Sequence, residues 1–448
     1  MNDGEQSGAG RKPEAQRQRS IYWVLSTYFA QGFPYTVVTV LSSLFFTNIN
    51  AKESIIGLLN SLGLPWNFKF LWAPFVEVFA TKRSWMIWLQ GLITLNLLGL
   101  ALLCFLAGSA ADTLPYLWII VVLLVVLGFL AATNDIAIDG YYMEGLQSEA
   151  DRAGYSGYRV LAYRIAMTYA RGGIVALVAY AATLLGTDSY YLPWCSGFLA
   201  CAVTMAALSF YHFFQLPNVE PPRKKLASAL EALHSYRRAF ASYLDQDRVA
   251  LILLFIVFYK MGDGVMFSMN TPFLRRELGV SNYQYAWLRA VVGFVGTISG
   301  AMLGGWWIKR VGLAKAIWPL TLTMNLAIWL YIALAFIKPD PDTLGGISTI
   351  SAVCLIEQFS AGLGSAALLV FLLGTCKPDF KAAHYAIGSA IMSVPATFLG
   401  SFSGFIVNAI GYTGLFSAAF VVALPSFVLL RALSLGKPLA ESPDRTGI

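Results

Sequence analysis

Three acidic residues lie at the end of a long apolar run. Asp135, Asp139 and Glu144 follow residues 113–131, which contain no charged side chain. Because Asp135 and Asp139 are four residues apart, they share one face of a helix. This pattern has three interpretations: charges at the edge of a membrane, ligands of a catalytic Mg²⁺, or a polar site in a transport pathway.

The composition indicates an integral membrane protein. Of the 448 residues, 57% are hydrophobic and 12% are charged, whereas soluble domains carry about 25% charged residues. The net charge of +7 comes mostly from Lys and Arg in short gaps between apolar runs. This distribution is typical of membrane proteins and argues against a nucleic-acid partner. The five cysteines show no CxxC spacing, so we expect neither a metal site nor a disulfide framework.

Twelve apolar runs are long enough to cross a bilayer, which takes about 20 residues each. The long polar gap at 216–248 divides them into two sets of six. The predicted spans are residues 20–46, 54–80, 84–107, 114–144, 155–186, 190–215, 249–275, 282–308, 314–337, 345–376, 381–409 and 412–433.

This pattern predicts an all-α integral membrane protein with twelve transmembrane helices in two six-helix bundles, the plan of the major facilitator superfamily. The gaps after odd-numbered spans hold few cations, namely Lys52, Arg275, Arg276 and Lys338. Since cytoplasmic loops are rich in Lys and Arg, we expect both termini in the cytoplasm. The expected domains are an N-terminal tail (1–19), a first bundle (20–215), a cytoplasmic linker (216–248), a second bundle (249–433) and a C-terminal tail (434–448).

Two basic residues cannot be kept out of the membrane. Only 15 uncharged residues, 54–68, precede Lys69 in its span, about 22 Å of helix against a core of about 30 Å. Only 16 uncharged residues separate Arg171 from Asp188. Charges inside a bilayer are costly and therefore mark functional sites. The alternative for Lys69 is a side chain that reaches back to the cytoplasmic headgroups.

The sequence places Lys260 and Asp263 near mid-membrane more clearly than any other charged residues. The flanks 249–259 and 264–274 offer 11 uncharged residues each. A spacing of three puts both charges on one face of a helix, where they neutralise each other. A purely structural ion pair is the alternative to a functional one, which we expect Arg171 and Lys69 to join.

The depth of other charges is open. Because 21 uncharged residues, 114–134, precede Asp135, it is able to lie at the cytoplasmic interface. Packing against the next span, which runs the opposite way, then places Asp135 near the depth of Arg164 and Asp139 near Arg159. We expect Asp135 and Asp139 to form a salt-bridged inner gate or the floor of a cavity.

Three further charges have alternative roles. Glu357 lies in a long span, anywhere from its outer third to mid-depth. Arg289 has 19 uncharged residues after it and is expected to extend to the membrane surface. Glu77 precedes Lys82 and Arg83 and is either part of a gating cluster or a plain interface charge.

The interior charges predict the chemistry of the substrate. An excess of cations in a dry cavity favours an anion, and a carboxylate there is able to take up a proton during transport. Tyr28, Gln31 and Tyr35 suit hydrogen bonds to hydroxyls and amides and stacking on a sugar face, although helix packing is an equal alternative for Tyr35. The candidate substrate-binding residues are Tyr28, Gln31, Tyr35, Lys69, Arg164, Arg171 and Lys260, and those for proton coupling or gating are Asp135, Asp139, Asp263, Glu357 and Glu77.

An enzyme is the remaining alternative. The segment "NDIAID" is close to the Asn-Asp-x-x-Asp motif of magnesium-dependent membrane prenyltransferases, but no second DxxxD or DxxD lies in any span. The sequence also contains no GxSxG, HExxH or Walker A motif. We therefore expect a secondary transporter that runs on an ion gradient, with no cofactor and no metal.

Six segments resemble the AmpG-like muropeptide permeases of the major facilitator superfamily in order and spacing. They are "FAQGFPY" (29–35), "NFKFLWAPFVE" (67–77), "ATNDIAIDGYYMEGL" (132–146), "GYRVLAYRIAM" (157–167), "YKMGDGV" (259–265) and "GTCKPDFKAAHYAIGSAIMSVPATFLGSFSG" (374–404). By motif, Lys69, Asp135, Asp139, Arg164, Lys260 and Asp263 fall on family-type positions.

The resemblance implies a proton symporter of the bacterial inner membrane, monomeric, that brings anhydro-muropeptides into the cytoplasm for peptidoglycan recycling. Such a substrate is GlcNAc-anhydro-MurNAc, or its monosaccharide form, with a peptide that carries carboxylates. Some family members have additional hydrophobic segments, for which the 33-residue linker here has no room. Because the wider group includes acetyl-coenzyme A transporters, another anion, such as an acyl-coenzyme A, a siderophore or a sugar acid, is the alternative cargo.

Overall fold

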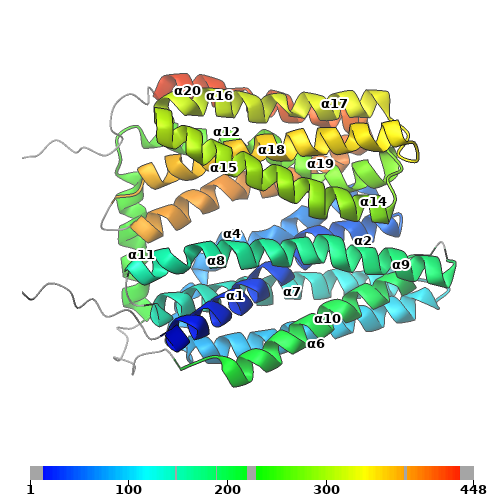
Figure 1. Ribbon diagram of the computed structural model, residues 1–448, viewed down its shortest axis with the longest axis horizontal. Coiled ribbons are helices and arrows are strands. Elements are labelled where there is room, and N and C mark those ends of the chain that lie inside the picture. Colours follow the sequence, from blue (N-terminus) through cyan, green and yellow to red (C-terminus); the bar gives the residue numbers. More distant parts are fainter. Residues whose placement is uncertain (1–13, 147–148, 188, 219–228, 378–380, 434–448) are drawn as a thin grey trace, which may run out of the picture.

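Long helices lie side by side along one axis of the molecule (Figure 1). The structure is a computed structural model that describes the chain except residues 1–13, 147–148, 188, 219–228, 378–380 and 434–448. The described residues contain helices and turns and no strand, which confirms the all-α prediction. Residues 1–13 of the predicted N-terminal tail, residues 219–228 of the linker and the predicted C-terminal tail therefore lie outside the described residues.

The helices of the first half of the chain occupy the lower part of Figure 1. Two short π-helical segments, η1 and η4, join α1 to α2 and α8 to α9. The elements are α1 (Glu14–Thr36), η1 (Val37–Leu41), α2 (Ser42–Asn48), α6 (Lys82–Gly108), α7 (Leu114–Gly145), α8 (Glu149–Thr168), η4 (Tyr169–Ile174), α9 (Val175–Leu185) and α10 (Tyr191–Gln215).

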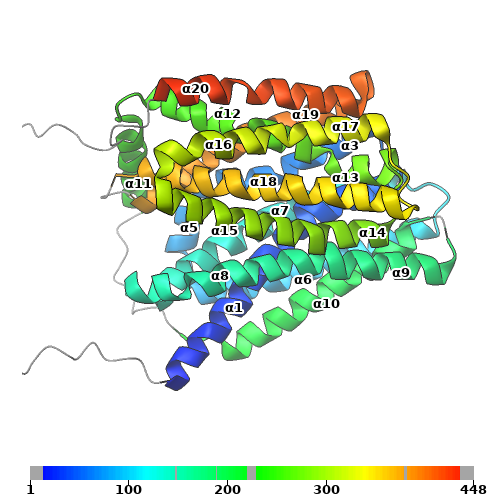
Figure 2. The same ribbon diagram turned by 45° about the horizontal axis from the view of Figure 1, so that its top comes forward.

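The helices of the second half occupy the upper part of the same view, and α11 (Ala229–Leu244) stands across one end of both groups (Figures 1 and 2). The elements are α12 (Val249–Ser268), α13 (Asn270–Pro272), η5 (Phe273–Glu277), α14 (Asn282–Trp287), η6 (Leu288–Val292), α15 (Gly293–Val311), α16 (Leu313–Leu326), α17 (Ile328–Ile337), α18 (Leu344–Gly374), α19 (Lys381–Ala423) and α20 (Pro425–Leu433).

Ten helical segments of the described chain are long and apolar enough to cross a membrane. The last of them, 47 residues long, includes a non-helical turn at Gly411, where φ is +72°. Glycine is the residue that adopts this φ without strain. The turn falls between the predicted spans 381–409 and 412–433, so the single long segment is compatible with two predicted spans.

The predicted span at 54–80 is broken into short pieces instead of forming one helix. They are α3 (Glu53–Leu58), η2 (Leu59–Gly63), α4 (Leu64–Phe68), η3 (Lys69–Leu71) and α5 (Ala73–Val78). Pro65 and Pro74 each lie in the first turn of a new piece, where proline's missing N–H does no harm, but each prevents a continuous helix. Because this segment is irregular, the count of twelve spans and the bundle boundaries stay predictions.

Arg276 joins the two halves at the end of the molecule opposite α11. From η5 it donates hydrogen bonds to the backbone oxygens of Phe46 (3.2 Å), Thr47 (2.7 Å) and Ala51 (2.7 Å), and its Nη1 lies 3.0 Å from Oε1 of Glu53. The carbonyls of Phe46 and Thr47 lie in the last turn of α2 and also accept the backbone N–H groups of Ala51 and Asn50. One guanidinium therefore adds to the cap of a helix of the other half and joins the two halves at this end.

We predict that Arg276→Ala opens this end of the molecule. Loss of several charge-assisted hydrogen bonds, each worth about 1.5–3 kcal/mol, shifts the population toward an open form by about tenfold or more. In a cysteine-free background, a Ser43→Cys probe should react correspondingly faster with a membrane-impermeant maleimide added to the predicted periplasmic side.

The matched control is Lys338→Ala, which removes an ion pair with Glu277 at the same end but within one half. Labelling should stay at the parent rate in this control. Equal labelling in the parent and Arg276→Ala proteins would contradict the assigned role of Arg276.

Candidate functional site

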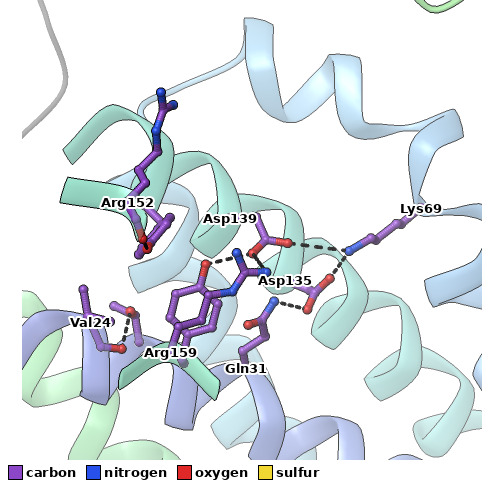
Figure 3. Close-up of polar contacts among 10 residues, drawn as sticks. Val24, Gln31, Lys69, Asp135, Asp139, Arg152 and Arg159 are labelled. Atoms are coloured by element: carbon purple, nitrogen blue, oxygen red, sulfur yellow. Dashed lines mark hydrogen bonds and ion pairs between the residues drawn. The ribbon is translucent and has the colours of Figure 1, made fainter. Parts of the chain in front are cut away.

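Lys69, Asp135 and Gln31 form a hydrogen-bonded cluster between three elements (Figure 3). The Lys69 ammonium forms an ion pair with Oδ2 of Asp135, and the Gln31 amide donates to Oδ1 of the same carboxylate. Asp135 is only 6% exposed, so both carboxylate oxygens need these partners. Lys69 reaches the pair because the broken segment places it at the start of η3, beside α7.

Asp139 lies one helical turn further along α7 and has a different set of partners. Tyr28 donates a 2.9 Å hydrogen bond to its Oδ1, and Nη2 of Arg159 lies 3.4 Å from the same oxygen. The Lys69 ammonium lies 3.9 Å from Oδ2. The Arg159 guanidinium also stacks on the ring of Tyr28, 4.7 Å from the centroid. Lys69 thus contacts both Asp135 and Asp139, whereas Arg159 contacts Asp139.

These groups line a cavity of about 520 Å³, which we call the polar cavity. Its charged residues are three cations and two acids, so the lining carries a net positive charge. Tyrosine and glutamine side chains supply the neutral hydrogen-bonding groups. The lining residues are Tyr28, Gln31, Tyr35, Lys69, Asp135, Asp139, Arg159, Val160, Tyr163, Arg164 and Met167.

A second cavity of about 260 Å³, the deep cavity, shares Tyr35 and Met167 with the polar cavity. It is lined from both halves of the chain. Two arginines face it, Arg171 from η4 and Arg289 from η6. The other lining residues are Thr39, Val40, Ser43, Ile56, Leu59, Asn60, Gly264, Phe267, Ser268 and Thr271.

Lys260 and Asp263 form an ion pair of 2.8 Å on α12 and do not line these two cavities. Glu357 of α18 is 1% exposed and accepts a 3.0 Å hydrogen bond from its neighbour Gln358. Its carboxylate lies within electrostatic reach of Asp263 and Arg289. Lys260, Asp263 and Glu357 are therefore electrostatic neighbours in the second half.

The structure corrects several predicted neighbours. Asp135 pairs with Lys69 instead of Arg164, whereas Asp139 does face Arg159. Lys69 forms its ion pairs with Asp135 and Asp139, and Lys260 and Asp263 pair with each other. Depth along a helix, which the sequence gives, does not say on which side of the helix a neighbour lies.

The prediction for Arg289 is wrong. Its Nε is buried and has no hydrogen-bond partner among the described residues, and the side chain lines the deep cavity instead of extending to the membrane surface. A count of apolar residues cannot give the direction of a side chain, and the π-helical segment that carries Arg289 changes that direction. Arg159 and Tyr163 are cavity residues that the sequence analysis did not select.

Two further predicted features have a limited description. Glu77 belongs to α5, but its side chain lies outside the described part of the structure. Among the described residues, no group of three or more His, Cys, Asp or Glu side chains could hold a metal ion. Asp135 and Asp139 are instead satisfied by cations and neutral donors.

The chain resembles bacterial permeases along most of its length. It is 26% identical over 407 residues to an anhydromuropeptide permease of Escherichia coli K12, which is 90% of this chain and 77% of that protein. It is 24% identical over 413 residues to a transporter named AmpG 4 of Rickettsia felis, covering 90% of this chain and 94% of the relative. No protein-family model matches the chain.

Solved structures of major facilitator transporters share the fold. The inward-open xylose transporter XylE of Escherichia coli superposes with a TM-score of 0.64 at 13% identity, covering 95% of this chain and 98% of that one. A bacterial homologue of the lysosomal transporter Spinster gives a TM-score of 0.65 at 16% identity, with coverages of 95% and 98%. The protein has the fold of major facilitator transporters. Its sequence is similar to AmpG-like permeases, as predicted, and these relatives give no support to the prenyltransferase alternative.

We predict that the cluster at Asp135 stabilises this transporter. Replacing Lys69 with Met leaves a buried carboxylate without its cation, which costs about 3–5 kcal/mol when a pair is fully buried. Because the Lys69 side chain is 32% exposed, we expect a loss of about 2 kcal/mol in unfolding free energy. The measurement is equilibrium unfolding of the purified protein in detergent.

The double variant Lys69→Met, Asp135→Asn should recover most of this loss, because no uncompensated charge remains. Lys338→Met, at an exposed pair with Glu277, should change stability by less than about 1 kcal/mol. Additive effects of the two cavity substitutions would show that the pair contributes nothing.

Proposed function

We propose that the protein imports anhydro-muropeptides across the bacterial inner membrane by proton symport, for peptidoglycan recycling. The supporting observation is the charge pattern of the polar cavity, where Lys69 and Arg159 contact carboxylates that are able to accept a proton. The printed name of the Escherichia coli relative supports the substrate class. In this proposal the transporter acts as a monomer with both termini in the cytoplasm.

The geometry suggests how substrate and proton are linked. While Asp135 is charged, it neutralises Lys69. Protonation of Asp135 releases that ammonium, which then binds a carboxylate of the substrate. When the proton leaves toward the cytoplasm, Asp135 takes Lys69 back and the substrate loses its partner. Proton and anion therefore cross together through competition for one cation.

The neutral lining suits the sugar part of such a substrate. Tyr28 and Tyr35 present aromatic rings and hydroxyls to the polar cavity, and Gln31 presents an amide. Sugars bind to proteins through stacking on aromatic faces and hydrogen bonds to such groups. A transporter for an inorganic anion would not need this combination.

We predict that uptake depends on the ion pair of α12. Sealed right-side-out vesicles that contain the wild-type protein should accumulate labelled anhydro-muropeptide when a pH gradient is imposed. Lys260→Ala and Asp263→Asn should each lose most uptake, because each substitution leaves one uncompensated charge on α12. Lys338→Ala, at an exposed pair, should transport normally. Normal uptake by both α12 variants would make that pair purely structural.

The cargo itself is tested in cells and by competition. Deletion of the gene in its Gram-negative host should raise anhydro-muropeptide in spent medium, and an unchanged level would contradict the proposal. The alternative function is transport of an acyl-coenzyme A, a siderophore or a sugar acid. It predicts that one of these binds the purified protein without competition from anhydro-muropeptide.

A further inference from the structure

We propose that Arg171 and Arg289 form an anion subsite in the deep cavity that binds a single carboxylate of the substrate. The identity of that substrate rests on the function proposed above, whereas the chemistry of the subsite does not. The subsite is distinct from the cluster at Asp135, in which the cations already have protein partners.

Neither arginine forms an ion pair with a described residue, although the Arg289 guanidinium lies 5.4 Å from the centroid of the Phe267 ring. The Nε atoms of Arg171 and Arg289 are buried and make no hydrogen bond to any described residue. No acidic residue is among those that line the deep cavity. By contrast, Lys69 and Arg159 in the polar cavity each lie within 4.0 Å of a carboxylate oxygen. The deep cavity therefore holds two positive charges and no lining carboxylate that compensates them.

The second half offers one acid in the vicinity, and it does not neutralise the arginines. Glu357 lies within electrostatic reach of Arg289, but no ion pair joins the two among the described residues, and its Oε1 has no hydrogen-bond partner there. Like charges in a medium of low dielectric repel. An anion between Arg171 and Arg289 relieves this repulsion and supplies acceptors to donors that are now unused.

The backbone directs both arginines toward this cavity. Arg171 lies in η4 and Arg289 in η6, and Thr39 of η1 lines the same cavity. A π-helical segment inserts an extra residue into a turn and is frequent at functional sites. Three such segments from three helices thus meet around one small polar space. Gly172 allows the close approach of η4 to η6, since a Cβ there would lie 2.6 Å from Cβ of Ala290.

The size and neutral lining favour a carboxylate over a bulky group. A volume of about 260 Å³ equals that of roughly nine water molecules, which is enough for an acidic side group but not for a disaccharide. Ser43, Asn60 and Thr271 add hydroxyl and amide groups. Because the two cavities share Tyr35 and Met167, a sugar in the polar cavity is able to extend its acid to the arginines.

The test compares an acid with its uncharged ester. N-acetylmuramic acid and its methyl ester differ in a single negative charge, and binding of each to the purified full-length protein is followed by thermal stabilisation in detergent. Wild-type protein should prefer the acid by about tenfold or more, as charge-assisted hydrogen bonds provide. Arg171→Gln and Arg289→Gln should each lose that preference while ester binding, which reports a folded site, is retained.

A matched control is Arg310→Gln, since Arg310 stacks on Trp306 away from both cavities, 4.3 Å from the ring. It should keep the wild-type preference. Equal binding of acid and ester by wild-type protein, absence of binding of either, or an unchanged preference in both cavity variants would overturn the subsite. If the preference is present and lost as expected but vesicles take up no muropeptide, the proposed function fails and the subsite stands.

Discussion

The ion pair between Lys69 and Asp135 determines how the first half of the transporter is built around its cavity. A charge inside a bilayer costs several kcal/mol unless it is paired, so the broken segment that carries Lys69 has to pack where α7 offers Asp135. Gln31 of α1 completes the carboxylate's hydrogen bonds. One buried carboxylate thus holds three elements together, and in the proposed function it is also the site of the transported proton.

A transport pathway also requires space between tightly packed helices, and irregular helical segments provide it. The π-helical segments η1, η4 and η6 line the deep cavity. The fourth such segment, η5, carries Arg276, which joins the two halves of the chain at α2. Regular helices of this apolar composition would pack without such spaces. The departures from regular helix therefore coincide with the residues to which we assign function, and the regular helices α6 and α10 serve as support.

The sequence predicted most of the long helices, because hydropathy and helix length are local quantities. It predicted Asp139 with Arg159 correctly, since antiparallel neighbours match in depth. It misplaced Lys69 and Arg289, because their positions depend on a proline-broken span and on a π-helical segment. These features arise from tertiary packing, and no spacing of residue types in the sequence marks them. The arginine pair of the deep cavity was for that reason visible only in three dimensions.

The central claim is that an anion and a proton compete for the same cation. Its most direct test is the proton movement that substrate evokes in proteoliposomes, recorded with a pH-sensitive dye at zero membrane potential, in wild-type protein and in Asp135→Asn. The account predicts that wild-type protein moves protons with anhydro-muropeptide, whereas Asp135→Asn binds the substrate and moves none. Substrate-evoked proton movement of wild-type size in Asp135→Asn would contradict it.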